Sequence, residues 1–229
     1  MMKDIKSIIE NKEGYVLLER VIPHNLIDDF VSKISELKPV RASNSDKKYA
    51  ERDAIKELEN INVWWSQEVS QLIECQKIKD IIDPILTTNF PNLEFYASDC
   101  VFIESKSQWV NPHVDTPYRF KKYNFDKRLL GIQCIVSLVD TNKENGSTGL
   151  VPFSHKRDFD IDKCYTGVFN RWFMDNVKQY DMPKGSLLFY NCRVLHSSMP
   201  NYSPNPRPML LLNYLNGDIV EDVKKIDNI

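Results

Sequence analysis

The chain is organised around the segment NPHVDTPY, residues 111–118. In an extended strand the side chains alternate between faces, so His113 and Asp115 point to the same side and lie close enough to hold one ion. An imidazole and a carboxylate are two thirds of the two-histidine, one-carboxylate set that binds non-haem Fe(II) with coordination positions left open. A His-x-Asp tripeptide also suits a solvated strand edge, so this segment alone does not establish a metal site.

A third metal ligand is available much later in the chain. His196 ends the apolar run SLLFYNCRVLH, residues 186–196, and Arg207 opens the next strand-like run. The alternative interpretation makes His196 a buried histidine satisfied by hydrogen bonds and Arg207 a surface cation. It leaves unexplained why one of four histidines ends an apolar strand shortly before a basic residue begins the next.

The composition limits the classes of partner. A chain of 229 residues fits one large β-rich domain or two small ones. Because 30 Lys and Arg nearly balance 32 Asp and Glu, we expect neither nucleic acid nor an anionic membrane surface to be the main partner. The composition thus shows no basic footprint.

The cysteines and the N-terminal sequence indicate the compartment. Five scattered cysteines without a Cys-x-x-Cys pair suggest neither a disulfide framework nor a structural zinc site. The first residues lack the apolar core of a secretion signal, and no apolar run approaches the length of a membrane helix. We therefore expect a cytoplasmic protein.

The hydrophobic pattern changes character near residue 90. Before it, apolar residues recur at helical spacing over 26–37, 61–73 and 78–86, with an unpatterned polar stretch at 40–53 that is either disordered or a cover for a site. After it come short β-type runs, at 93–103, 111–118, 129–139, 149–151, 186–196 and 208–214. This predicts a mainly β fold with an α layer, in which helices of residues 1–90 pack on an antiparallel sandwich or jelly roll of residues 91–216.

Four features in this order resemble the phytanoyl-CoA dioxygenase family of Fe(II)- and 2-oxoglutarate-dependent oxygenases. They are His113-x-Asp115, the segment NGSTGLVPFSH at 145–155, His196, and Arg207 within PNYSPNPRP at 200–208. The resemblance covers roughly residues 93–215 and implies a double-stranded β-helix, which is a cupin-like jelly roll. We accordingly treat residues 1–229 as a single oxygenase domain.

The resemblance also implies roles for individual residues. It places His113, Asp115 and His196 on Fe(II), and it pairs Arg207 and Ser198 with the distal carboxylate of 2-oxoglutarate, with O2 as the second cosubstrate. The planar fork of Arg suits a carboxylate, since it can form two parallel hydrogen bonds. Ser198 could instead be a turn hydroxyl satisfied by its own backbone.

Two details refine the comparison. The family commonly has Pro-Gly-Ser-His where this chain has PFSH at 152–155, so Phe153 must fit a turn built for glycine, and we expect His155 to fix this loop without binding metal. Related halogenases replace the carboxylate ligand with a small residue so that halide can bind, whereas Asp115 fills that position here. The implied reaction is therefore hydroxylation of an unactivated C–H bond, with release of succinate and CO2.

The substrate side is less defined. Trp109, Tyr118 and Arg119 adjoin the metal segment and are candidates for the rim of the site, and Gln133 is a candidate to face the cosubstrate. Trp172 lies in the aromatic-rich stretch 165–180, which is either a lid or a packed helix. Each also suits a role in packing or on the surface.

Two other functional classes fit a jelly roll. One is a non-catalytic binding module that uses the mouth of the barrel, and the other is a cupin-like metal enzyme that does not use 2-oxoglutarate. Neither requires a cation at position 207. The sequence indicates neither the oligomeric state nor the identity of the substrate.

Overall fold

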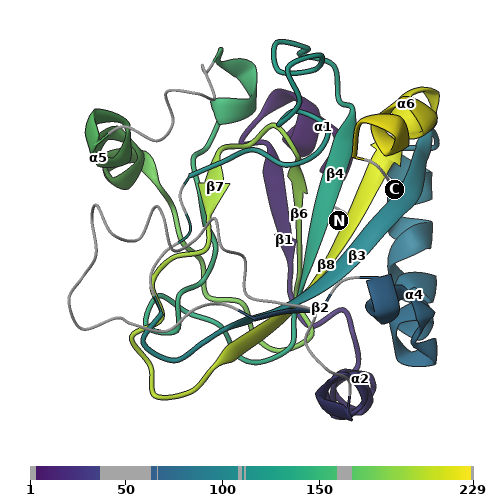
Figure 1. Cartoon of the computed structure of the whole chain (residues 1–229), viewed down its shortest axis with the longest axis vertical. Helices are drawn as coiled ribbons and strands as arrows, with labels where there is room; N and C mark the ends of the chain where they lie inside the picture. Colours follow the sequence, from purple (N-terminus) through teal and green to yellow (C-terminus); the bar gives the residue numbers. More distant parts are fainter. Residues whose placement is uncertain are drawn as a thin grey trace.

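The computed structural model describes residues 4–36, 63–65, 67–107, 110, 112–158 and 167–227. These residues form a large and a small antiparallel sheet, with helices packed along the outside of the large one (Figure 1). The stretch 40–53 and Trp109 lie outside the described residues, so the predictions made for them are not addressed by the structure.

The larger sheet has six strands in the spatial order β1-β6-β4-β8-β3-β2. Their bounds are Tyr15–Leu18 for β1, Leu187–Asn191 for β6, Gly131–Ser137 for β4, Arg207–Asn216 for β8, Leu93–Ile103 for β3 and Val63–Trp65 for β2. All of these pairings are antiparallel.

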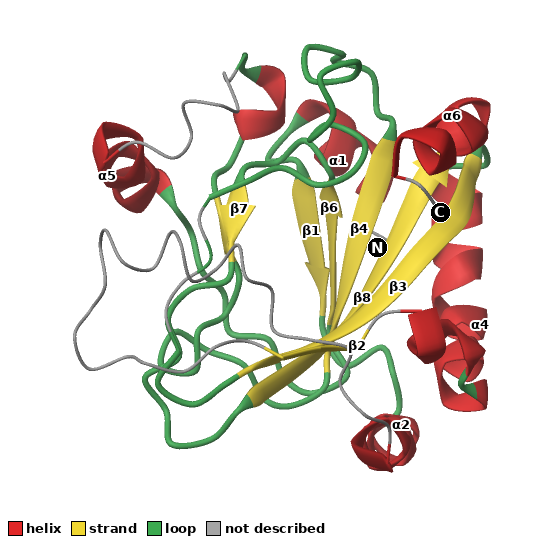
Figure 2. Cartoon of the chain, in the orientation of Figure 1, coloured by secondary structure: helices red, strands yellow, loops and turns green. Residues whose placement is uncertain are grey.

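The smaller sheet faces the larger one. It pairs β5, Gly149–Leu150, with β7, His196–Ser197. Leu150 shares a buried cluster with Ile135 and Met209, whose side chains project from the inner face of the large sheet. Two facing antiparallel sheets with side chains between them are the jelly roll that the sequence predicted, and that prediction is confirmed (Figure 2).

A helical layer covers the outer face of the large sheet. It consists of α1 (Ile5–Asn11), α2 (His24–Glu36) and α4 (Ile73–Asn89). Because side chains alternate along a strand, Ile132, Cys134 and Val136 of β4 point outward into a cluster that includes Ile78 and Ile82 of α4. Burial of each such aliphatic side chain contributes roughly 1.5–3 kcal/mol to folding, which fixes the sheet and so positions its inner face.

The prediction of a helix over residues 61–73 is wrong. Val63–Trp65 form the edge strand β2, which pairs with β3, and Gln67–Gln71 form a short 3-10 helix, η1. Helix α4 starts only at Ile73 and runs through Pro84. Pairing of β2 with an available sheet edge outweighs local helical periodicity, since most secondary-structure stability comes from tertiary contacts.

The run 186–196 is two strands. Strand β6 ends at Asn191, whose side-chain Oδ1 accepts a hydrogen bond from the Arg193 main-chain N at 2.9 Å, while its carbonyl accepts one from the Val194 N at 2.7 Å. This Asn-stabilised turn takes the chain from the large sheet to the small one. As a result, His196 opens β7 and faces the large sheet.

Helices α5 (Gly167–Asn176) and α6 (Gly217–Asp227) lie on opposite sides of the molecule in Figure 1. Phe173 of α5 is fully buried in a second cluster with Val220 and Val223 of α6. The stretch 165–180 thus contains a helix that buries Phe173, and a role as a lid stays a prediction. No helix in the described ranges combines the length and the apolar character that a membrane span needs.

Phe153 gives a testable consequence of the PFSH turn. It adopts the left-handed conformation, with φ of 60° and ψ of 5°, and its side chain is 47% exposed. A bulky L residue in this region costs about 1 kcal/mol, and an exposed ring returns little packing. Phe153→Gly should therefore raise the free energy of unfolding in urea by about 0.5–1 kcal/mol. A matched change at an exposed ring with ordinary φ, Phe125→Gly, should lower it, and destabilisation by Phe153→Gly would contradict this account.

Candidate functional site

The backbone joins the two segments that carry the candidate metal ligands. His113 and His196 form an isolated antiparallel bridge, in which the His113 N donates to the His196 carbonyl at 2.9 Å and the His196 N donates to the His113 carbonyl at 3.0 Å. The Asp115 N donates to the Cys192 carbonyl at 2.8 Å. Residues 112–115 thus lie along β7 without forming a regular strand, yet His113 and Asp115 still face the same side.

The side chains of His113, Asp115 and His196 converge. Their candidate ligand atoms all lie within 4.8 Å of one another. His113 Nε2 is 3.8 Å from Asp115 Oδ1, and His196 Nε2 is 3.4 Å from Asp115 Oδ2. Ligand atoms bound about 2.1 Å from one ion lie roughly 3 Å apart, so small side-chain adjustments would complete such a site. Within the described residues, this is the group of His, Cys, Asp and Glu with metal-binding spacing.

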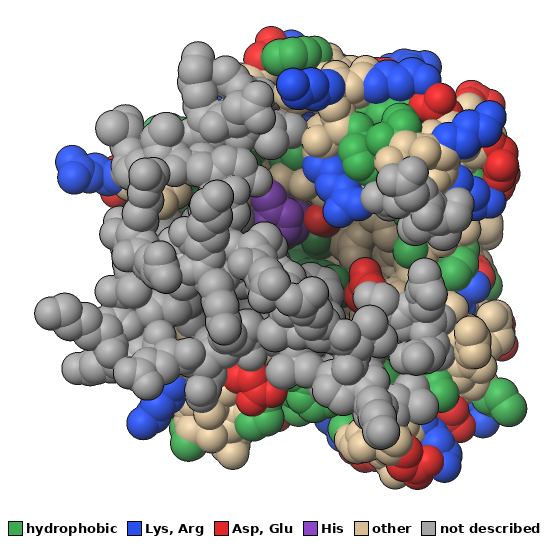
Figure 3. All heavy atoms as spheres, viewed as in Figure 1, with side chains coloured by type: hydrophobic (Ala, Val, Ile, Leu, Met, Phe, Trp, Pro, Cys, Tyr) green, Lys and Arg blue, Asp and Glu red, His purple; other side chains and the backbone are tan. Residues whose placement is uncertain are grey.

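Access to the cluster is one-sided. The His196 side chain is 6% exposed, whereas those of His113 and Asp115 are 33% and 23% exposed. Figure 3 shows histidine atoms next to acidic and basic atoms in a hollow on one face of the molecule. An ion held here would be anchored on the barrel side and reachable from the other.

His196 is in the form that a metal requires. Its Nδ1 lies 3.0 Å from the Val194 carbonyl, so Nδ1 carries the proton and Nε2 is left with its lone pair. Burial lowers the pKa of His196 to about 4, although the Asp115 carboxylate acts in the opposite direction. The imidazole is therefore neutral at physiological pH.

Tyr190 of β6 contacts two members of the cluster. Its hydroxyl donates to Asp115 Oδ2 at 2.8 Å and lies 3.2 Å from His196 Nε2. Burial, and next the Asp115 charge, raise the pKa of Tyr190 well above its ordinary value, so the hydroxyl keeps its proton.

Arg207, the first residue of β8, is a buried cation. Its Nε donates to the Asn145 carbonyl at 3.0 Å and its Nη1 lies 3.3 Å from Met209 Sδ, but its Nη2 is buried without a hydrogen-bond partner. Among the described residues, no carboxylate influences the pKa of this guanidinium, which only burial shifts. Burial lowers the pKa of Arg207 to about 10. A buried guanidinium with an orphaned nitrogen is suited to an anionic ligand.

The sequence profile of the family "Phytanoyl-CoA dioxygenase (PhyH)" matches residues 11–209. The chain belongs to this family. The resemblance drawn from the ordered motifs is thus confirmed over nearly the whole chain, and not only over the β part.

One curated relative of this phytanoyl-CoA dioxygenase family member is distant in sequence. A curated relative from Stutzerimonas stutzeri, a "Probable alpha-ketoglutarate-dependent hypophosphite dioxygenase", is 26% identical over 175 residues, which is 72% of this chain and 58% of the relative. The match therefore spans less than two thirds of that protein's length.

Solved structures support the fold. The epimerase SnoN from nogalamycin biosynthesis superposes with a TM-score of 0.71 over 93% of this chain and 79% of its own, at 17% identity. HygX from Streptomyces hygroscopicus, solved with nickel and 2-oxoglutarate, gives a TM-score of 0.67 over 94% and 87%, at 14% identity. At such low identities these two enzymes show the fold of this family member and not its reaction.

Ser198 and Gln133 both lie near the cluster. Ser198 is 8% exposed, and its carbonyl accepts a hydrogen bond from the Ser197 hydroxyl at 3.0 Å, while its contact with 2-oxoglutarate stays a prediction. Gln133 is opposite Tyr190 in the β4–β6 register and points to the inner face. Its Oε1 accepts a hydrogen bond from Asn213 Nδ2 at 2.7 Å, and Asn213 Oδ1 is buried without a partner.

Tyr118 lies in the core and not at the rim where we expected it. Its side chain is fully buried, its hydroxyl donates to the Arg128 carbonyl, and it accepts from the Leu130 N at 2.7 Å. Its hydroxyl is thus used to hold the loop before β4. The aromatic ring gains more from burial than it would at an open mouth.

The other two candidates for substrate contact differ in exposure. Arg119 is exposed, its guanidinium stacks over the Phe120 ring at 5.0 Å, and its main-chain N donates to the Asp115 carbonyl. Trp172 is partly buried against the second cluster, with Arg157 5.6 Å from its ring centroid. Arg119 is therefore tied to the metal segment through the backbone, and Trp172 lies against the second buried cluster.

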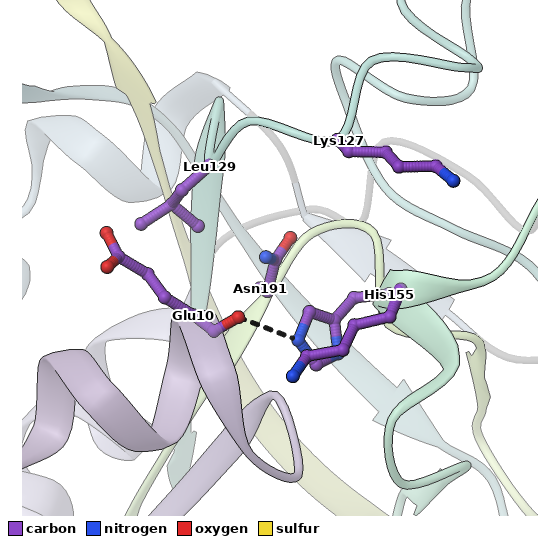
Figure 4. Close-up of a pocket in the computed structure, with 6 residues that line it drawn as sticks. Glu10, Lys127, Leu129, His155 and Asn191 are labelled. Carbon is purple, nitrogen blue, oxygen red and sulfur yellow. Dashed lines mark hydrogen bonds between the residues drawn. The ribbon is translucent and has the colours of Figure 1, made fainter.

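His155 has the structural role expected of it. It lies in η2, Ser154–Lys156, where its Nε2 is 3.3 Å from the Glu10 carbonyl and its ring packs against Gly14. Gly14 has φ of +90°, and a Cβ there would meet His155 Nδ1 at 2.5 Å, so only glycine fits. Figure 4 shows the small cavity beside it, about 140 Å³, lined by Glu10, Lys127, Leu129, His155, Lys156 and Asn191. None of the candidate metal ligands lines it, so this cavity is separate from the site.

Sequence reasoning missed Tyr190 and Asn213. Both belong to runs that were predicted as strands, and alternation places each on the inner face. What the sequence does not give is the register that sets Tyr190 against Asp115 across 75 positions.

Proposed function

We propose that this protein is an Fe(II)- and 2-oxoglutarate-dependent dioxygenase that hydroxylates a C–H bond of a small molecule. The observation that carries the proposal is the convergence of His113, Asp115 and His196 within 4.8 Å at the mouth of a jelly roll of this family. Two imidazoles and a carboxylate on one side of an ion leave the opposite positions open, as oxygen-activating Fe(II) requires.

The residues present fit both groups. His113, Asp115 and His196 would hold iron, and Arg207 with Ser198 would hold the distal carboxylate of 2-oxoglutarate. The orphaned Nη2 of Arg207 supports this, because a carboxylate would satisfy it and neutralise the buried charge. Gln133, on the inner face beside Tyr190, is a candidate for a further contact with the cosubstrate.

When bound, iron and 2-oxoglutarate would supply the oxidation, in which one oxygen atom of O2 enters succinate as CO2 is lost and the other becomes the hydroxyl of the product. The residues of the chain would hold the iron and 2-oxoglutarate, orient the substrate, and exclude water. His196 stays neutral, Asp115 contributes negative charge, and the buried barrel interior keeps solvent from the inner side of the site.

Two other classes remain distinguishable. A binding module without catalysis, or a cupin-like metal enzyme that does not use 2-oxoglutarate, has no need for a cation buried at position 207. Asp115 argues against halide binding at the metal, and so against halogenation. The buried guanidinium of Arg207 is thus the feature that favours 2-oxoglutarate over both alternatives.

A small-molecule substrate is supported by the curated relative, a probable hypophosphite dioxygenase, and by SnoN, which has been solved in complex with nogalamycin RO. The near-neutral composition and the free, buried thiols of Cys75, Cys100, Cys134 and Cys192 fit a cytoplasmic enzyme.

Turnover tests the proposal directly. Protein purified without metal and supplied with Fe(II), ascorbate and 2-oxoglutarate should form succinate, and the rate should rise with the right member of a metabolite panel. Omission of Fe(II) should remove this activity. Iron retained by the wild type and lost in His196→Ala, without any 2-oxoglutarate consumption, would point instead to the cupin-like enzyme. A metal-free protein with an intact fold would favour the binding module.

A further inference from the structure

Tyr190 sits at a rigid position in the large sheet. It lies on β6, between Tyr15 of β1 and Gln133 of β4 in the strand register, and its side chain is 2% exposed. Hydrogen-bonded neighbours on both sides fix its backbone, and the buried cluster around the ring fixes its direction. The hydroxyl therefore has little freedom to move away from the candidate metal ligands.

The hydroxyl has one preferred acceptor. It is 2.8 Å from Asp115 Oδ2 and 3.2 Å from His196 Nε2. Hydrogen bonds to a charged acceptor are shorter and about twice as strong as bonds between neutral groups, so the proton goes to the carboxylate. His196 Nε2 then keeps its lone pair.

The carboxylate of Asp115 needs such a contact. Its backbone is held by the Cys192 carbonyl, but rotation about the last side-chain torsion of Asp is only weakly restricted. Tyr190 holds Oδ2, whereas no hydrogen bond reaches Oδ1 from any of the described residues. Oδ1 is the oxygen that faces His113, at 3.8 Å from its Nε2.

We propose that Tyr190 is a positioning residue of the metal site, which holds Oδ2 of Asp115 so that the carboxylate offers a single oxygen to the ion. This inference rests on the proposed function, because it takes the cluster to be a metal site. A carboxylate that bound through both oxygens would occupy a position that the cosubstrates need. Tyr190 would therefore both strengthen metal binding and keep coordination positions open for the cosubstrates.

Tyr190→Phe tests the inference by removing one oxygen atom and little else. Loss of a hydrogen bond to a ligating group typically weakens metal binding by 10–100-fold. We expect this loss in anaerobic calorimetric titrations with Mn(II). We also expect the visible charge-transfer absorption of the anaerobic Fe(II)–2-oxoglutarate complex to change in position or intensity, which a purely structural role would not cause.

Tyr15→Phe is the matched control. Tyr15 occupies the same row of the sheet on the neighbouring strand, and its hydroxyl bonds to that of Tyr180 at 2.7 Å, not to a candidate ligand. It should leave Mn(II) affinity and the absorption band unchanged. Tyr190→Met, which fills the space without a donor, is a second variant and should repeat the loss.

The outcomes distinguish failure of the positioning role of Tyr190 from failure of the proposed function. Wild-type protein that binds Mn(II) and 2-oxoglutarate, together with a Tyr190→Phe variant that matches it within twofold in affinity and spectrum, would refute the positioning role and leave the proposed function standing. Wild-type protein that binds neither would overturn the proposed function, and the inference with it.

Discussion

Asp115→Ala is expected to abolish 2-oxoglutarate turnover and to weaken metal binding by more than about 100-fold. Loss of a hydrogen-bond partner of a metal ligand weakens metal binding by up to about 100-fold, and here the ligand itself is removed. Asp115 supplies the anionic member of the cluster, and two neutral imidazoles hold a divalent ion far less well. Succinate formation and bound iron, measured on the same preparations, check this result.

The control for Asp115→Ala must show that the fold survives. Asp115 is partly exposed, so its removal leaves no large cavity, but it leaves the Tyr190 hydroxyl without its acceptor. The double variant Asp115→Ala, Tyr190→Phe removes both groups and should unfold at a similar or higher temperature than Asp115→Ala. Retention of wild-type metal affinity by either variant would contradict the assignment of Asp115 as a ligand.

Arg207→Met should separate stability from function. Burial of an unpaired guanidinium is costly, as the desolvation that lowers the pKa of Arg207 to about 10 indicates. Replacement by an apolar side chain of similar length should therefore leave the free energy of unfolding of the ligand-free protein unchanged or raise it by about 1–3 kcal/mol, less the lost bond to Asn145. Urea unfolding measures this change.

The same substitution should damage cosubstrate binding. Truncation of one partner of a buried charge pair costs about 2–5 kcal/mol, so affinity for 2-oxoglutarate should fall at least roughly 30-fold. Saturating 2-oxoglutarate should raise the melting temperature of the metal-loaded wild type and not that of Arg207→Met. Arg207→Lys keeps the charge and loses the planar fork of the guanidinium. Its affinity for 2-oxoglutarate should lie between those of the wild type and Arg207→Met. A destabilised Arg207→Met with unchanged 2-oxoglutarate affinity would make Arg207 a structural residue.

The sequence was most informative where chemistry and periodicity agreed. The β runs after residue 90 and the spacing of His113 and Asp115 predicted the jelly roll and the juxtaposition found in the structure. Arg207 could be singled out because a basic residue opens the strand-like run that follows His196, and a cation in an apolar strand is unfavourable without a partner.

The features that escaped prediction depend on long-range pairing. The strand Val63–Trp65 exists because β3 offers an edge, which no local pattern reveals. Tyr118 is buried because its hydroxyl satisfies two main-chain groups beyond residue 127, and the contact of Tyr190 with Asp115 follows from the turn that ends β6. To predict any of these features, one needs the register of the strands in the folded sheet, which the order of residues in the sequence does not give.

Anaerobic titration of 2-oxoglutarate into the protein, with and without Mn(II), tests the central claim most directly. The convergence of His113, Asp115 and His196, together with the buried cation of Arg207, predicts one molecule bound per chain, with affinity that depends on the metal and is lost in His196→Ala. No heat of binding under either condition, for protein shown to be folded, would contradict it.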